Sequence, residues 1–311
     1  MTFTRNHMRK QAAAFVLALA CLMTLLCPAF AEDAVRVSYL GPAGTYTEEA
    51  TQFFFEDAML NPKETVNDAI ADLLSGEADY AVIPQENSLG GAVVNYVDAL
   101  LSAEGAYVVG EVVLPISQTL MGVPGATLDD IQTVCSHAQG LTQSAKWRAE
   151  NLPDAEAREM ASTAAAASFV AETGDKTIAA VAAPGAAPLY GLEILAENVQ
   201  ILDTNKTRFY VLARAARDEG TRATFVADCE AGELPGILAA LDKAGLSLVA
   251  LHDRPNGRLG TYRYLIEAED ASGITEEQLA ACLGAGLRFL GRFNAVEKGK
   301  TVADCGLENA A

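Results

Sequence analysis

Short apolar segments that stop at Gly, Pro or polar loops recur along the chain, and most are followed by a helical segment. Val35–Leu40 alternates in polarity and ends at a Gly-Pro pair, as a strand does. Thr47–Phe55 begins with a capping threonine and two glutamates, which is typical of a helix start. A helix is predicted at Val66–Ser75, with a glycine past its end, and further strands are predicted at Tyr80–Ile83 and Tyr107–Leu114. Strands and helices in alternation predict α/β sheets.

A second set of strands and helices follows before residue 214. Its predicted strands, helices and extended segments are, in order, Ile131–Cys135, Leu141–Asn151, Thr163–Glu172, Thr177–Val181, Ala182–Tyr190, Val199–Leu202 and Arg208–Ala213. Two sets of this size predict two α/β lobes with a cleft between them.

The last third of the chain has a different pattern. A polar stretch over 215–221 is interpreted as a linker. The segments after it have the order β-α-β-β-α-β, which is the ferredoxin-like arrangement: Arg222–Asp228, Leu234–Ala244, Leu246–His252, Thr261–Glu267, Thr275–Leu287 and Phe289–Phe293.

Composition excludes several classes of function. Half of the 311 residues are hydrophobic, which supports packed cores, and the formal net charge is −19. Because such an acidic surface repels phosphate backbones, nucleic acid is not an expected partner. The chain has three His and no CxxC spacing, and a metal site is therefore not expected.

The first 31 residues have the three parts of a secretory signal. Three basic residues precede the uncharged apolar run Ala12–Leu26, and Ala29-Phe30-Ala31 offers small residues for cleavage after Ala31. A membrane anchor would need a longer apolar run, and Leu26 before Cys27 is a poor context for a lipid anchor. We therefore expect a periplasmic or secreted protein with no membrane attachment after cleavage. Four cysteines would remain in it, and an oxidising compartment permits three pairings among them: Cys135, Cys229, Cys282 and Cys305.

Four loops carry side chains that could bind a ligand or take part in catalysis. Gly41–Thr47 and Pro84–Val93 each follow a strand, where α/β folds keep ligands. Ser136–Gln143 is polar after a strand, and Asn205–Phe209 holds a hydroxyl, a cation and an aromatic ring together. Each loop alone could be an ordinary turn, a helix cap or a solvated surface segment. Their order and spacing together are the stronger signal.

With these motifs in view, the chain resembles the prephenate dehydratases. GPAGTYTEEA (41–50), IPQENSLGGAV (83–93), VCSHAQGLTQSAKW (134–147) and NKTRFYVL (205–212) are similar to motifs of that family. Gln85 stands where the family has Ile, and Ala138 where it has Pro. In the last third, Gly236-Ile-Leu238 and His252-Asp-Arg-Pro255 resemble the G-A-L and E-S-R-P segments of the family's ACT regulatory domain.

The resemblance implies a fold and a reaction. The fold is two lobes like a periplasmic binding protein followed by a ferredoxin-like ACT domain, divided as 1–31 signal, 32–214 catalytic domain, 221–295 ACT domain and 296–311 tail. The reaction converts prephenate to phenylpyruvate with loss of water and carbon dioxide, without a metal or organic cofactor. L-Phenylalanine is a possible effector, and a homodimer or homotetramer is expected.

The resemblance also implies roles for single residues. Thr207 would hydrogen-bond the departing hydroxyl, Glu86 would supply the proton if burial raises its pKa, and Arg208 would hold the retained carboxylate. Other candidates for the catalytic and substrate-binding site are Asn87, Phe209, Ser136, Gln143, Thr163, Ser88 and Thr45. The candidates for the regulatory site are Pro235, Gly236, Ile237, Leu238, His252, Asp253, Arg254 and Pro255.

Three alternatives stay open on the sequence alone. An arogenate dehydratase would share this machinery and give phenylalanine directly. An exported solute receptor would keep the cleft and lose catalysis. An amino-acid sensor built around the ACT domain would bind without turnover.

Overall fold

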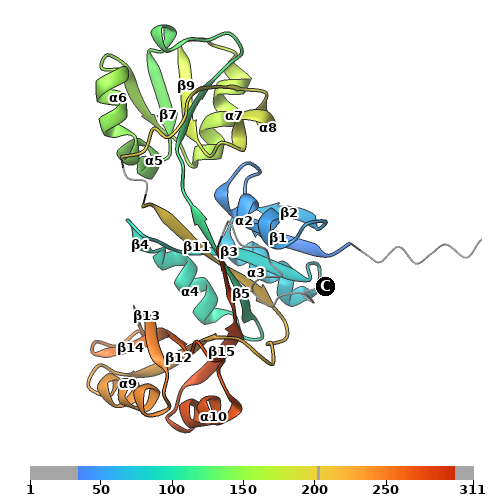
Figure 1. Ribbon diagram of the computed structural model, residues 1–311, viewed down its shortest axis with the longest axis vertical. Coiled ribbons are helices and arrows are strands. Elements are labelled where there is room, and N and C mark those ends of the chain that lie inside the picture. The colour runs from blue at the N-terminus through green and yellow to red at the C-terminus, as the bar shows by residue number, and fades with distance from the viewer. Residues whose placement is uncertain (1–33, 202–203, 298–311) are drawn as a thin grey trace, which may run out of the picture. The chain divides into compact units, whose positions relative to one another are not determined.

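The computed structural model describes residues 34–201 and 204–297. The predicted signal (1–31), most of the predicted tail (296–311) and Cys305 lie outside these residues. Within them, the strands form three sheets (Figure 1), and no helix has the length and apolarity needed to cross a membrane. Three cysteines in the same ranges are free thiols: Cys135, Cys229 and Cys282.

The first sheet carries the first lobe and, in the described residues, has seven strands in the order β16-β5-β11-β3-β1-β2, with β4 beside β3. These strands are β1 (Arg36–Leu40), β2 (Met59–Lys63), β3 (Tyr80–Asn87), β4 (Gly91–Ala92), β5 (Tyr107–Pro115), β11 (Lys206–Ala213) and β16 (Ala295–Glu297). β1 pairs in parallel with β2 and β3, whereas β11 runs antiparallel between β3 and β5. β11 therefore sits in the middle of the sheet.

Helices cover both faces of this sheet. α3 (Val66–Ser75) and α4 (Val94–Ser102) share one apolar core with it, and α2 (Tyr46–Phe54) belongs to a second core. The helix ends follow local chemistry: the Thr65 hydroxyl accepts the Asp68 N–H at 3.1 Å, and Gly76 ends α3 with a φ of 83°. α3 has the bounds that the sequence predicts.

The second lobe has a five-stranded sheet in the described residues, in the order β10-β6-β9-β7-β8. Its strands are β6 (Thr119–Gly122), β7 (Thr133–Ser136), β8 (Glu156–Glu159), β9 (Ile178–Ala182) and β10 (Glu193–Ala196), and its helices are α5 (Ala138–Gln143), α6 (Ala145–Asn151), α7 (Thr163–Thr173) and α8 (Ala186–Tyr190). A single helical turn, η1 (Leu128–Asp130), precedes β7.

Two chain segments connect the lobes, 116–118 on the way out and, among the described residues, 197–201 and 204–205 on the way back. They lie side by side, because the Val199 N–H donates to the Gln118 carbonyl at 2.8 Å and the Ile116 N–H to the Asn205 carbonyl at 2.9 Å. Two α/β lobes joined by paired crossings are the arrangement of periplasmic binding proteins. This confirms the predicted fold class.

The last sheet has the order β13-β14-β12-β15. Its elements follow the predicted β-α-β-β-α-β order: β12 (Arg222–Glu230), α9 (Leu234–Lys243), β13 (Ser247–Pro255), β14 (Thr261–Glu269), α10 (Glu276–Gly284) and β15 (Arg288–Phe293). All its neighbours pair antiparallel, with β12 and β14 in the middle, and the ferredoxin-like topology is thereby confirmed. We call this unit the ferredoxin-like domain.

The ferredoxin-like domain packs directly on the first lobe. Tyr210 of β11 meets Phe293 of β15 with ring centroids 5.7 Å apart, in one continuous apolar core. Gly291 has a φ of 145°, and a Cβ there would lie 2.1 Å from the Val108 carbonyl oxygen, so only glycine permits this approach of β15 to β5. β16 then pairs in parallel with β5 of the first lobe and spans the predicted boundary at residue 295.

Several elements differ from the prediction. The single helix expected over Leu141–Asn151 is two helices, α5 and α6, separated at Ser144, whose hydroxyl donates back to the Gly140 carbonyl at 2.8 Å. β2, β8 and β10 were not predicted, because they are short edge strands and β8 is exposed throughout. The buried β6 was not predicted either, and Val199–Leu202, expected to be extended, is not a strand where described.

Candidate active site

A cavity of about 230 Å³ lies where the two lobes meet. It is walled by ends of elements from both lobes and by the crossing segment 116–118. Its lining residues are Tyr46, Asn87, Tyr96, Ile116, Gln118, His137, Gln139, Gly140, Gln143, Ala161, Ser162, Thr163 and Thr207. Among these described lining residues there is no Lys, Arg, Asp or Glu. The cavity is therefore polar through hydroxyl, amide and imidazole groups.

Thr207 and Asn87 form the part of the wall that the first lobe's central strands supply. They face each other across the β11–β3 pair. The Asn87 Oδ1 accepts the Leu89 and Gly90 N–H groups, both at 3.0 Å, which fixes the orientation of the amide. Its Nδ2 therefore faces Thr207 and donates to Oγ1 at 3.0 Å. Because Thr207 Oγ1 accepts this bond, its own proton is available to a group in the cavity.

The second lobe contributes amides to the opposite wall. Gln139 Nε2 of α5 donates to Asn87 Oδ1 at 3.3 Å and so links the two lobes across the cavity. Gln118 Nε2 donates to Gln143 Oε1 at 2.9 Å, and both side chains are buried. Gly140 brings α5 close to β7, since a Cβ there would lie 2.3 Å from Ser136 Oγ.

Helix α7 points its N-terminus at the cavity. Its first residue, Thr163, and its capping residue, Ser162, both line the wall, and the Ser162 hydroxyl accepts the Ala165 N–H at 2.9 Å. The first N–H groups of an α-helix have no partner inside the helix and carry partial positive charge. This end of α7 can therefore stabilise an anionic group without a cationic side chain.

Two phenols complete the wall. The Tyr46 hydroxyl donates to the Ser117 carbonyl of the crossing segment. Burial raises the pKa of Tyr46 and of Tyr96, so both remain neutral hydrogen-bonding groups at physiological pH. His137 stands at the edge, where its Nδ1 accepts the Gln139 N–H at 3.3 Å.

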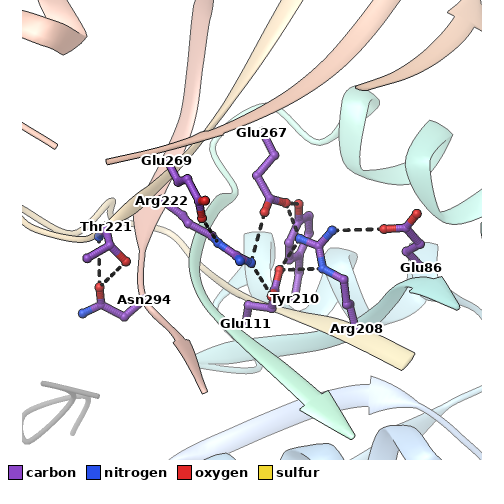
Figure 2. A network of polar contacts seen from close by, with 9 residues as sticks. All are labelled: Glu86, Glu111, Arg208, Tyr210, Thr221, Arg222, Glu267, Glu269 and Asn294. Atoms are coloured by element: carbon purple, nitrogen blue, oxygen red, sulfur yellow. Dashed lines mark hydrogen bonds and ion pairs between the residues drawn. The ribbon is translucent and has the colours of Figure 1, made fainter. Parts of the chain in front are cut away.

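Glu86 and Arg208 do not face this cavity. Successive side chains of a strand point to opposite sides of a sheet, and each of these residues is next to a cavity residue, Asn87 or Thr207. The Arg208 Nη1 lies 3.0 Å from Glu86 Oε2, and its Nε lies 3.0 Å from Glu111 Oε2 (Figure 2). The structure thus places both side chains outside this cavity, and the roles of Arg208 in holding a substrate carboxylate and of Glu86 as the acid stay predictions.

Four other predicted substrate contacts also lie elsewhere. Thr45 caps α2, where its hydroxyl accepts the Glu48 N–H at 3.4 Å. Phe209 is buried in the apolar core beneath α2. The buried Ser136 donates to the Val181 carbonyl at 2.6 Å, and the exposed Ser88 donates to the Thr204 carbonyl at 3.2 Å. Their hydroxyls and ring serve the fold at these positions.

The cavity thus brings together four of the predicted residues: Asn87, Thr207, Gln143 and Thr163. Six other lining residues were not predicted from the sequence: Tyr46, Tyr96, Ile116, Gln118, His137 and Gln139. Tyr46, His137 and Gln139 belong to the motif loops already quoted, so the motifs were the signal that could have found them. Tyr96 and Ile116 lie outside the loops and depend on how α4 and the crossing segment pack.

The predicted regulatory residues lie in two elements of the ferredoxin-like domain. The first turns of α9 carry Pro235, Gly236, Ile237 and Leu238, and the end of β13 carries His252, Asp253, Arg254 and Pro255. Arg254 makes a two-point ion pair with Asp98 of α4, at 2.6 and 2.8 Å. This end of β13 is therefore bound to the first lobe.

Together these features define a class: a two-lobed α/β enzyme with a small polar cavity between its lobes and an appended ferredoxin-like domain. Comparison with known proteins is more specific. Residues 37–217 match the prephenate dehydratase family. A prephenate dehydratase from Lactococcus lactis is 32% identical over 281 residues, which cover 86% of this chain and all of that protein. The chain belongs to the prephenate dehydratase family, and it is by that membership a dehydratase, a carbon–oxygen lyase.

Two solved structures are similar over most of the chain. A prephenate dehydratase from Arthrobacter aurescens in complex with L-Phe has a TM-score of 0.75 and 32% identity, covering 83% of this chain and 90% of its own. GqqA, described as a novel type of quorum-quenching acylase, has a TM-score of 0.74 and 28% identity, covering 84% and 98%. The fold is thus shared by proteins of more than one named activity.

Proposed function

We propose that this chain converts prephenate to phenylpyruvate, a step in the biosynthesis of phenylalanine. Membership of the family supports the reaction. The observation that carries the proposal is the hydrogen bond at Thr207: Asn87 donates to its oxygen, so the hydroxyl proton is left free to donate to a group in the cavity between the lobes. A donor fixed in this way before substrate binds is suited to a leaving hydroxyl group.

The reaction needs a proton and a route for electrons. The bond between the ring and its carboxylate breaks, carbon dioxide leaves, and the bonding electrons move into the ring as it becomes aromatic. The carbon–oxygen bond of the ring hydroxyl breaks at the far side, and the hydroxide leaves as water after taking up one proton. Thr207 hydrogen-bonds the departing oxygen, and solvent supplies the net proton because a threonine hydroxyl is a weak acid.

The uncharged cavity suits the carboxylate that is lost. An ion pair with Arg or Lys would stabilise that carboxylate before it leaves and would oppose decarboxylation. Amides and hydroxyls hold it less strongly, and the described lining offers only such groups. The retained carboxylate can bind at the N-terminus of α7, where backbone N–H groups and the Thr163 hydroxyl supply donors.

The direct test is to incubate the purified protein lacking residues 1–31 with prephenate and to measure phenylpyruvate by its absorbance in alkali. We expect turnover with prephenate and a higher kcat/KM for it than for arogenate. Preferential turnover of arogenate would show that the protein is an arogenate dehydratase. Binding of prephenate without any product would overturn the proposal and favour a solute receptor or an amino-acid sensor.

We further propose that the ferredoxin-like domain is an ACT domain that pairs through its sheet in a homodimer or homotetramer. Support comes from its topology and from the relative that was solved with L-Phe. Ile237, His252 and Asp253 depart from the family's segments, so we expect L-phenylalanine to bind only weakly. Calorimetry with L-phenylalanine tests this expectation, and clear binding at low micromolar concentration would contradict it.

Export and the division into domains remain proposals drawn from the sequence. The predicted signal, 1–31, has the composition of a cleaved leader. N-terminal sequencing of the protein from a native host would give a first residue of Glu32 if cleavage follows Ala31. An intact N-terminus in the cytoplasm would overturn the proposal.

A further inference from the structure

A cluster of buried charges joins the ferredoxin-like domain to the first lobe. Arg208 of β11 and Glu111 of β5 come from the lobe, and Arg222 of β12 and Glu267 of β14 come from the domain (Figure 2). Arg208 contacts both carboxylates, and Arg222 Nη1 lies 2.8 Å from Glu111 Oε1 and 3.3 Å from Glu267 Oε1. The side chain of Glu111 is 0% exposed and that of Glu267 is 1% exposed. We call these four residues the interdomain cluster.

The interdomain cluster holds strand β11 in particular. Glu267 receives hydrogen bonds from two residues of this strand, the guanidinium of Arg208 and the hydroxyl of Tyr210. Buried charges lose their hydration, so separating them without their partners is costly, whereas an exposed ion pair can break freely. The strand is therefore held to the domain at two of its residues.

Thr207 precedes Arg208 on the same strand and points to the other side of the sheet. A shift or twist of β11 that moves Arg208 from Glu267 must also move Thr207 relative to Asn87, because one peptide unit joins the two residues. Helix α4 repeats the pattern: Tyr96 lines the cavity, and Asp98, two residues on, pairs with Arg254 of the domain. The ferredoxin-like domain therefore contacts both β11 and α4, and each of these elements carries a residue of the cavity.

We propose that Arg208 is a positioning residue: through the interdomain cluster, the docked ferredoxin-like domain holds Thr207 in its productive place. The proposal rests on the proposed function for the role of Thr207. It gives the Thr207-Arg208-Phe209 segment two roles on the two faces of one strand. Turnover should then depend on the contacts of the interdomain cluster, although the ferredoxin-like domain does not line the cavity.

Glu267→Gln in the full chain tests the proposal, because the change removes a charge and keeps the shape. We expect kcat with prephenate to fall about ten- to a hundredfold while KM changes little, since small displacements of a catalytic group cost about that much. Asp228→Asn is the matched control. Asp228 pairs with Arg263 of the same domain at 2.9 Å and is not part of the interdomain cluster, so its loss should leave both constants unchanged.

Hydrogen exchange supplies a readout that does not depend on activity. The amides of β11 should exchange faster in Glu267→Gln than in the wild type and in Asp228→Asn. Arg208→Lys keeps the positive charge and loses the planar guanidinium group, so it should show the same faster exchange. This variant replaces Glu267→Gln in the test if Glu267→Gln does not fold. Unchanged exchange of β11 in the variant that folds would overturn the proposal.

A double variant separates positioning from a general loss of stability. If Glu267 acts through Thr207, then Glu267→Gln should lower kcat much less in a Thr207→Val background than in the wild type. An equal fold-loss in both backgrounds would overturn the proposal. Absence of turnover in the wild type would instead overturn the proposed function, and the exchange of β11 would still decide whether the interdomain cluster holds the strand.

Discussion

The two faces of the β3–β11 pair carry opposite chemistry within a stretch of two residues. On the cavity face, Asn87 and Thr207 are uncharged and bind each other through a single oriented hydrogen bond. On the other face, Arg208 forms ion pairs with Glu86 and with Glu267 of the ferredoxin-like domain. Adjacent residues of one motif thus serve different ends because a strand presents them to different sides.

This difference teaches how to interpret such motifs. A run such as Thr207-Arg208-Phe209 suggests one site in which hydroxyl, cation and ring act on one ligand. In the folded chain the hydroxyl lines the cavity, the cation holds a domain and the ring fills a core. The two faces can be tested separately, because variants on the cavity face should change turnover with little change in stability, whereas variants on the cluster face should also lower stability.

The largest effect is expected on the cavity face. Thr207→Val removes the oriented hydroxyl and keeps the volume, so kcat with prephenate should fall about 10²–10³-fold, as it does when one oriented donor is lost elsewhere. The melting temperature should stay near that of the wild type. Steady-state kinetics and thermal unfolding together check the prediction, and a near-normal kcat would remove Thr207 from the mechanism.

On the cluster face, Glu111→Gln should act mainly on stability. Burial raises the pKa of Glu111, yet Arg208 and Arg222 both depend on its charge, and its loss leaves buried cations undercompensated. We expect the free energy of unfolding in urea to fall by about 3 kcal/mol.

Glu230→Gln is the control for that measurement, because Glu230 forms an exposed ion pair with Arg258. Its loss should cost less than about 1 kcal/mol. Equal costs for the two variants would show that the interdomain cluster contributes no more than a surface ion pair.

A smaller effect is expected at Ser88, which was predicted to bind substrate and lies outside the cavity. Its hydroxyl donates to the Thr204 carbonyl and accepts the Lys206 N–H at 2.9 Å. Ser88→Ala should lower the free energy of unfolding by about 1 kcal/mol and leave KM for prephenate unchanged. A marked rise in KM would indicate that Ser88 contacts the substrate after all.

The smallest effect concerns pH. Burial lowers the pKa of His252 below its ordinary 6.5, although Glu86 and Glu267 oppose the shift, and its Nε2 has no hydrogen-bond partner in the described part of the chain. As pH falls below 6.5, the unfolded chain binds a proton before the folded chain does, so stability is lost. Between about pH 8 and pH 5, the melting temperature of the wild type should therefore fall further than that of His252→Gln. Parallel curves would contradict this.

Some of the fold could be predicted because local signals agree with it. Helix α3 ends before Gly76 as expected, and the order of elements in the last third is sufficient for its topology. Edge strands such as β8 could not be predicted, since an exposed strand has no apolar face. Ser144 divides a helix through a hydrogen bond that composition does not reveal.

The sequence by itself determined the family, the α/β and ferredoxin-like elements and the loops from which the cavity is built, because these depend on local residue order and on motif spacing. Only the tertiary structure decided which side of each strand faces the cavity, that no Lys, Arg, Asp or Glu lines it among the described residues, and that Arg208 meets Glu267, 59 positions along the chain. The physical reason is that such contacts are set by sheet pairing and domain docking, which join residues far apart in sequence.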